Sequence, residues 1–172
     1  MKKGYIHVYT GPGKGKTTAA LGLGIRAAGA GMKVHMVQFM KGRRYSEIDT
    51  IESIKNFTIS QHGRDEFVSK EKPDQVDIDL AQKGFKYTKE IVNNGKYDVI
   101  ILDELNVAVD YNLISLKDVI NLLEKKPEKL ELILTGRNAH PEIVRNADLV
   151  TEMLEIKHPY QQGVTGRKGI DF

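Results

Sequence analysis

A glycine-rich turn between an apolar run and a helix-forming run constrains the fold of this chain more than any other feature. The apolar run spans residues 5–9, the turn reads Thr10-Gly-Pro-Gly-Lys-Gly-Lys-Thr-Thr18, and the helix-forming run begins at Ala19. Strand, glycine-rich turn, Lys-Thr and helix in this order are typical of a phosphate-binding P-loop. Glycines let several backbone N–H groups converge on one anion, and the helix N-terminus adds partial positive charge.

The residue types in the turn fit this chemistry. Lys16 places an ammonium on phosphate oxygens, and the Thr17 hydroxyl can ligate Mg²⁺. The usual pattern has glycine where this chain has Thr10, but Gly11 and Gly13 can supply the turn. The alternative, a glycine-rich turn with incidental lysines, does not explain the Lys-Thr-Thr that opens the helix. The residues expected to bind phosphate are Gly11, Pro12, Gly13, Lys14, Gly15, Lys16, Thr17 and Thr18.

Composition limits the class of protein. The 172 residues suggest one domain over 1–172, with enough chain for a real core. A net charge of +3 is too small to indicate nucleic-acid binding, and the absence of cysteine excludes disulfides and thiolate metal sites. No apolar run reaches membrane-spanning length, and Met1-Lys2-Lys3 leads directly into the first apolar run, so no signal peptide is expected. We therefore expect a cytoplasmic protein that binds neither nucleic acid nor membranes.

Apolar runs and helical patterns alternate along the chain, which predicts an α/β fold with a parallel sheet. The expected strands span residues 5–9, 34–39, 57–60, 97–102, 130–134 and 149–154, and the expected helices span 16–30, 47–54, 73–93, 115–125 and 141–146. The polar stretch 61–73, with Phe67 as its only aromatic residue, is long for a loop inside a domain and is expected to be functional or mobile.

Charged residues follow three of the expected strands. The strand 97–102 runs into Asp103-Glu104, a Walker B pattern whose carboxylates would hold Mg²⁺ or its water; the alternative is a simple helix cap. Arg137 follows the strand 130–134 and could reach a triphosphate. The basic loop 40–44 follows the second strand, at the sheet edge where α/β proteins bind ligands, so a functional loop and a merely solvated one are equally supported.

The histidines do not suggest a metal site. His7 and His35 lie within expected strands, where neutral core or edge positions explain them. His140 and His158 each precede a proline at the boundary of an element. None is spaced from another as metal ligands usually are.

Several motifs together point to one family. In order, they are Thr10–Gly22, Val37-Gln-Phe-Met-Lys-Gly42, Leu102-Asp-Glu-Leu105, Leu134-Thr-Gly-Arg137, Lys157-His-Pro-Tyr160 and Gly169-Ile-Asp-Phe172. Over essentially its whole length, the chain closely resembles the CobA/BtuR family of ATP:corrinoid adenosyltransferases. The resemblance implies a RecA-like P-loop NTPase domain, a three-layer sandwich with a mostly parallel six-stranded sheet, that works as a homodimer.

The resemblance also implies an activity, in cobalamin biosynthesis or salvage. The 5′-deoxyadenosyl group of ATP is transferred to the Co(I) of a corrinoid and triphosphate is released, with Mg²⁺ as cofactor and a flavoprotein reductant as a further partner. ATP would lie in reversed orientation, with its terminal phosphates in the P-loop. Carried over by position, Lys16 and Glu104 are catalytic, Thr17, Asp103 and Glu104 serve the metal, Arg26 and Arg137 are secondary phosphate contacts, and Phe67 and Lys41 lie on the corrinoid side.

The chain departs from the family pattern in two places. Family members carry a Phe-x-Trp pair in the loop that holds Phe67 here, and this chain has no tryptophan. Related proteins also have an N-terminal helix that can cover the site, whereas here the first strand is expected to begin by Tyr5. Two other activities stay open. A P-loop kinase would produce ADP, and an ATP-binding switch protein would bind ATP without turnover.

Overall fold

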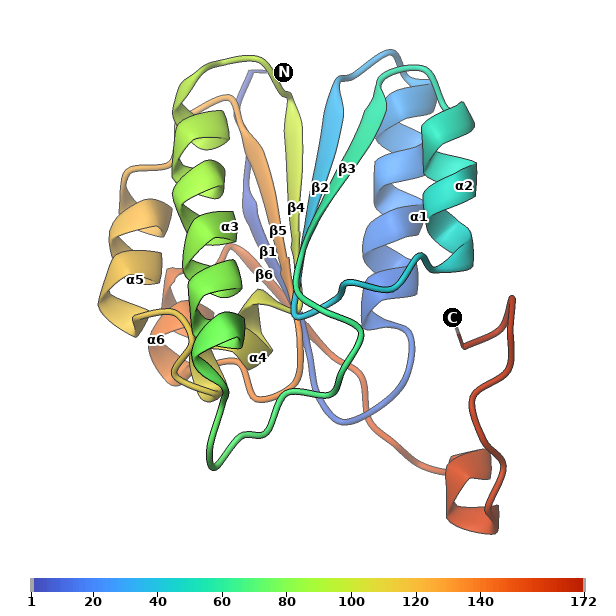
Figure 1. The fold of residues 1–172 in the computed structure, drawn as a ribbon. Helices are drawn as coiled ribbons and strands as arrows, with labels where there is room; N and C mark the ends of the chain where they lie inside the picture. Colours follow the sequence, from blue (N-terminus) through green and yellow to red (C-terminus); the bar gives the residue numbers. More distant parts are fainter. Residues whose placement is uncertain (1, 172) are drawn as a thin grey trace.

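Six strands form one sheet in the computed structural model, which describes residues 2–171 (Figure 1). Their order is β3-β2-β4-β5-β1-β6, and every neighbouring pair is parallel. The sheet expected to be mostly parallel is therefore parallel throughout. The strands are β1 (Ile6–Thr10), β2 (Val34–Phe39), β3 (Phe57–His62), β4 (Val99–Asp103), β5 (Glu131–Thr135) and β6 (Leu149–Glu152).

Helices cover both faces of the sheet. They are α1 (Lys16–Gly29), α2 (Ser46–Ser53), α3 (Gln75–Asn93), α4 (Leu105–Asp110), α5 (Leu116–Glu124) and α6 (Pro141–Asn146), with a 3-10 helix η1 (Pro159–Gln162) near the C-terminus. Figure 1 shows α1 and α2 on one face and α3, α5 and α6 on the other. The predicted three-layer α/β arrangement is confirmed. None of the helices within residues 2–171 is long and apolar enough to cross a membrane.

The strand β4 shows why the sheet is buried on both faces. Ile100 and Leu102 belong to the core cluster under α3, α4, α5 and α6, whereas Val99 and Ile101 belong to the cluster under α1 and α2. Successive side chains of a strand point to opposite faces, so a strand with two covered faces needs a continuous apolar run. The apolar run that predicted this strand thus fills both cores.

A parallel sheet gathers the carboxyl ends of all its strands at one edge. The P-loop, the end of β4 and the end of β5 therefore lie together at the lower edge in Figure 1. The segment after β6 also leaves from this edge, carries η1 away from the sheet, and returns toward the P-loop end of α1. Ligands of open α/β sheets bind at this edge.

Candidate active site

Glycine is required at the three alternating positions of the P-loop for two different structural reasons. Gly11 and Gly15 adopt φ values of 95° and 114°, which glycine reaches without strain. Gly13 is needed because another backbone lies against it: a Cβ atom there would stand 2.6 Å from the Leu154 carbonyl oxygen. The Gly13 N–H donates to the Met153 carbonyl at 2.7 Å. The segment after β6 therefore packs directly on the P-loop.

Lys16 folds back onto this loop. Its side chain is buried, and Nζ donates to the carbonyl oxygens of Gly11 at 2.8 Å and Gly13 at 2.7 Å. Burial lowers the pKa of Lys16, while the negative charge of Glu104 acts in the opposite direction. The lysine of the P-loop thus keeps the loop in shape while it stands at the start of α1, beside the pocket.

Asp103 ends β4 and is completely buried. One of its oxygens accepts hydrogen bonds from the hydroxyls of Thr17 and Thr135, both at 2.8 Å. The other accepts from Lys41 Nζ at 2.7 Å and from Gln38 Nε2 at 3.2 Å. Burial would raise the pKa of Asp103, but the charge of Lys41 and the hydrogen bonds from Lys41, Thr135 and Thr17 hold it below its usual value. The carboxylate is therefore ionised and its oxygens are occupied.

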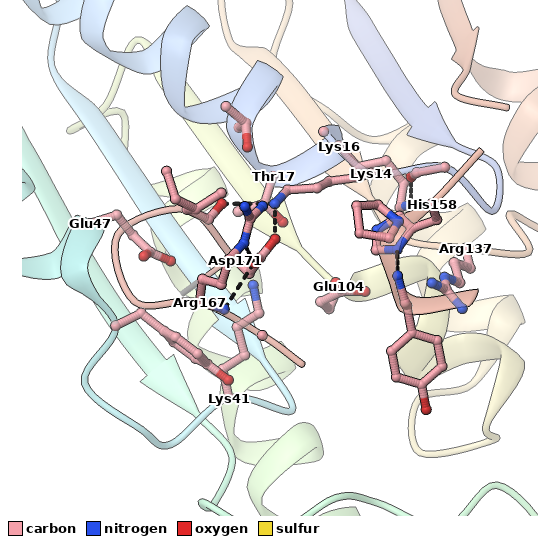
Figure 2. A pocket seen from close by; sticks show the side chains of 18 of the residues that line it. Lys14, Lys16, Thr17, Lys41, Glu47, Glu104, Arg137, His158, Arg167 and Asp171 are labelled. Carbon is pink, nitrogen blue, oxygen red and sulfur yellow. Dashed lines mark hydrogen bonds and ion pairs between the residues drawn. The ribbon is translucent and has the colours of Figure 1, made fainter. Parts of the chain in front are cut away.

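Glu104 follows in a left-handed conformation, with φ 61° and ψ 17°. Such a conformation costs a residue other than glycine about 1 kcal/mol or more. The Glu104 N–H donates to Thr135 Oγ1 at 3.0 Å, and the side chain lines the pocket. Figure 2 shows Glu104 between Lys41 and Arg137. Burial and the neighbouring Asp103 raise the pKa of Glu104, whereas Lys41, Lys16 and Arg137 act to lower it.

One cavity of about 1070 Å³ joins these groups. Its wall is formed by the P-loop, the start of α1, the loops that follow β2, β3, β4 and β5, parts of α2 and α4, and the C-terminal segment. Of the residues proposed from the sequence, Gly11 and Asp103 lie behind this wall and support it. Those that line it are Pro12, Gly13, Lys14, Gly15, Lys16, Thr17, Thr18, Lys41, Phe67, Glu104 and Arg137.

The structure does not bring Arg26 to the pocket. Arg26 is exposed in the last turn of α1, and the helix runs away from the P-loop. At a rise of about 1.5 Å per residue, ten residues separate Arg26 from Lys16 by roughly 15 Å. Its position gives no support to the phosphate contact carried over from the family.

The basic loop after β2 is divided between two environments. Lys41 lines the pocket and forms an ion pair with the buried Asp103. Burial alone would lower the pKa of Lys41, but Asp103 raises it well above its usual value. Arg44 instead pairs with Asp49 and Glu52 on the exposed side of α2. The functional interpretation of this loop therefore concerns Lys41, which lines the pocket and pairs with the buried Asp103.

The C-terminal segment forms a wall of the pocket that sequence reasoning did not assign to the site. Lys14 Nζ donates to the Ile170 carbonyl at 2.8 Å and forms an ion pair with the Asp171 carboxylate. Asp171 also accepts from the Arg167 N–H at 2.9 Å and from Arg167 Nε at 3.1 Å (Figure 2). Phe172, the last residue of the Gly-Ile-Asp-Phe motif, lies outside the described residues.

Other contributors were visible in the sequence only as parts of motifs. Gln38 stands within Val-Gln-Phe, and Thr135 within Leu-Thr-Gly-Arg.

The two His-Pro boundaries prove to be helix starts: His140 accepts a hydrogen bond from the Glu142 N–H, and His158 accepts one from the Tyr160 N–H.

Comparison with known proteins places the chain. A family model described as ATP:corrinoid adenosyltransferase BtuR/CobO/CobP matches residues 2–172. The chain belongs to this family. The resemblance inferred from the sequence motifs is thus confirmed, and with it the P-loop fold class.

Similar proteins carry the same activity in their names. A corrinoid adenosyltransferase of Sinorhizobium sp is 37% identical over 174 residues, which cover 99% of this chain and 81% of the relative. The corrinoid adenosyltransferase of Escherichia coli K12 is 34% identical over 177 residues, covering 99% and 87%. That of Pseudomonas aeruginosa is 33% identical over 172 residues, covering 99% and 85%.

Proposed function

We propose that this protein transfers the 5′-deoxyadenosyl group of ATP to the Co(I) of a corrinoid and releases triphosphate, in cobalamin biosynthesis or salvage. The observation that carries the proposal is a single pocket that combines a P-loop with the exposed aromatic ring of Phe67, in a chain of the adenosyltransferase family. The P-loop suits the polyphosphate of ATP, and an apolar ring suits contact with a flat macrocycle.

The reaction needs charge stabilisation more than proton transfer. Co(I) of the substrate attacks the ribose 5′ carbon, a cobalt–carbon bond forms, and the bond from that carbon to the phosphate oxygen breaks. The electron pair leaves with the triphosphate, so negative charge develops on the leaving group. Lys14, Lys16 and Arg137 line the pocket where these phosphates would lie, and fixed cations are effective there. Co(I) carries no proton, so no general base is required.

The residues of the site fit a Mg²⁺ ion that arrives with ATP. Among residues 2–171, no hydrogen bond reaches the Glu104 carboxylate, although burial raises its pKa and makes a cationic partner favourable. In that same range no group of three or more His, Asp or Glu side chains could hold a metal alone. Glu104 and Thr17 would therefore hold the ion together with phosphate oxygens, with Asp103 orienting the Thr17 hydroxyl. When bound, Mg²⁺ would neutralise charge on the leaving triphosphate.

The proposal includes the setting that the family resemblance implies. The enzyme would be a cytoplasmic homodimer, and a flavoprotein would supply the electron that produces Co(I).

One reaction mixture tests the proposal. Protein, ATP, Mg²⁺ and chemically reduced cobalamin are expected to give adenosylcobalamin by visible absorbance and an equal amount of triphosphate by phosphorus NMR. Chelation of Mg²⁺ should stop both. Stoichiometric ADP would instead identify a kinase, and ATP binding with no turnover would identify a switch protein.

A matched pair of variants tests the assignment of Glu104 in the same assay. Glu104→Gln should lower the rate about 100-fold, because a neutral amide binds Mg²⁺ poorly. Glu52→Gln, on the exposed side of α2, makes the same change of charge away from the pocket and should have the wild-type rate. Equal rates in the two variants would exclude Glu104 from the metal site.

A further inference from the structure

The loop between β3 and α3 is anchored at two points that lie symmetrically about Phe67. Arg64 lies three residues before Phe67 and Lys70 three residues after it, and each forms an ion pair with a different helix. Between the two, Val68 packs against the hydrophobic core. The Phe67 side chain itself is 103% exposed and lines the pocket.

The first anchor joins Arg64 to α3. Its Nε and Nη2 donate to the two oxygens of Asp77, both at 2.8 Å, and the guanidinium also pairs with Asp74. Asp77 is only 4% exposed, so this is a two-pronged contact with a buried carboxylate, the geometry in which arginine is most selective. The backbone of this loop also packs closely on the loop after β2, because a Cβ atom on Gly63 would stand 2.3 Å from the backbone nitrogen of Lys41.

The second anchor joins Lys70 to the end of α4. Its Nζ donates to both oxygens of Asp110, at 2.8 and 2.7 Å, and lies 5.7 Å from the centre of the Tyr111 ring. Asp110 accepts a third hydrogen bond, at 3.0 Å, from Asn138. Burial would raise the pKa of Asp110, but the hydrogen bonds from Lys70 and Asn138 hold it below its usual value.

Asp110 therefore connects two loops that both contribute residues to the pocket. Lys70 belongs to the loop of Phe67, and Asn138 follows Arg137 in the loop after β5. The Asp110 carboxylate thus links the loop that carries Phe67 to the loop that carries Arg137.

We propose that Arg64 and Lys70 are positioning residues that hold Phe67 outward at the pocket before the corrinoid binds, and that Asp110 fixes this loop relative to Arg137. The inference rests on the proposed function, because it takes the corrinoid as the ligand of Phe67. An unanchored loop would let the ring bury its apolar surface elsewhere. Because the anchored loop is already ordered, corrinoid binding does not have to supply the conformational entropy cost of ordering it. Such preorganisation strengthens affinity.

Lys70→Met is the main test variant, because its partner Asp110 can be solvated when the pair is lost. Arg64→Met is the second variant. Arg44→Met is the matched control, since it breaks an exposed ion-pair cluster on α2 that does not belong to this loop. In the substrate-free protein, amide hydrogen exchange over residues 65–69 should become about tenfold faster in both test variants and stay unchanged in the control.

Kinetics provide the second measurement, with cob(I)alamin as the probe. The KM for cob(I)alamin should rise about tenfold in Lys70→Met, with the KM for ATP unchanged, and Lys70→Arg should restore it. Unchanged exchange over residues 65–69, or an equal rise in both KM values, would overturn the proposal. If the wild-type protein makes no adenosylcobalamin, the proposed function fails, and the exchange result alone then decides whether the loop is anchored.

Discussion

Two adjacent carboxylates of the site lie in different environments. Asp103 ends its strand inside the sheet edge, where four donors occupy its oxygens. The left-handed turn at Glu104 places the next carboxylate in the pocket instead. A Walker B pattern in the sequence does not separate these environments. In the structure Asp103 contacts the Thr17 hydroxyl, while Glu104 is the carboxylate that lines the pocket.

His35 gives this protein a specific sensitivity to acid. The ring is 3% exposed in β2, with Nδ1 2.7 Å from Thr58 Oγ1 and Nε2 3.1 Å from Ser60 Oγ. It packs 5.6 Å from the Tyr87 ring and 4.9 Å from the Tyr97 ring. Burial, and then the charges of Lys96 and His62, lower the pKa of His35 to about 4. Of the core or edge position expected from the sequence, His35 therefore has the core one.

The consequence for stability follows from proton linkage. As the pH falls below the ordinary histidine pKa of 6.5, His35 becomes protonated in the unfolded chain, whereas in the folded chain it stays neutral until about pH 4. The free energy of unfolding therefore decreases as the pH falls from about 6.5 to about 4. We expect His35 to remove about 2 kcal/mol from the free energy of unfolding between pH 7 and pH 5. Urea unfolding of the wild type and of His35→Asn at the two pH values tests this expectation. The free energy of unfolding should decrease less in the variant, because only groups such as His62, whose pKa is also lowered by burial, still contribute to the decrease. An identical loss in both proteins would contradict it.

At the scale of elements, the glycines of α1 are not equivalent. Glycine inside a helix can allow the helix to pack closely on a sheet, because it has no Cβ atom. This holds for Gly24, where a Cβ atom would stand 2.7 Å from the Phe57 ring and 3.1 Å from Ile101 Cδ1. It does not hold for Gly22 or Gly29, which have open space where a Cβ atom would lie.

This difference predicts opposite effects for the same substitution in one helix. Gly22→Ala should raise the free energy of unfolding by about 0.5–1 kcal/mol, because alanine restricts the unfolded chain and favours the helix. Gly24→Ala should lower it by about 1–3 kcal/mol, because the helix must move away from the sheet. Denaturant unfolding of the two variants measures both. Equal stabilisation by the two alanines would show that the contact with Phe57 is not a constraint.

The elements also show what the sequence could and could not predict. Long apolar runs and amphipathic stripes identified six strands and five of the helices, with ends displaced by a few residues. The helix α4 was missed, because six residues after a strained turn have too little periodicity to be recognised. The contact of Lys41 with Asp103 was also missed. It requires β2 to lie beside β4 with Gln38 opposite Asp103, and no local pattern in the chain specifies which strands are neighbours.

At the scale of the whole molecule, the C-terminal segment contacts the P-loop. Lys14 in the P-loop and Asp171 are separated by 157 residues, yet they form an ion pair at the pocket. The hydrogen bonds from Lys14 and Arg167 hold the pKa of Asp171 well below its usual range. A carboxylate is thus paired with a cation that we expect to bind phosphate.

Removing that carboxylate should strengthen anion binding. Asp171→Asn frees Lys14, and the dissociation constant for inorganic triphosphate should fall by a factor of about two to five, as the loss of an exposed ionic competitor predicts. Asp79→Asn, on the exposed side of α3, makes the same change in net charge away from the pocket and should bind like the wild type. Titration calorimetry at low ionic strength measures all three proteins, and added salt should reduce the difference. Because the pKa of Asp171 is lowered, its carboxylate stays ionised as the pH falls from 7 to 5, so the gain should be the same at both values. Weaker binding by Asp171→Asn would instead mean that the carboxylate holds Lys14 in the position from which it binds the anion.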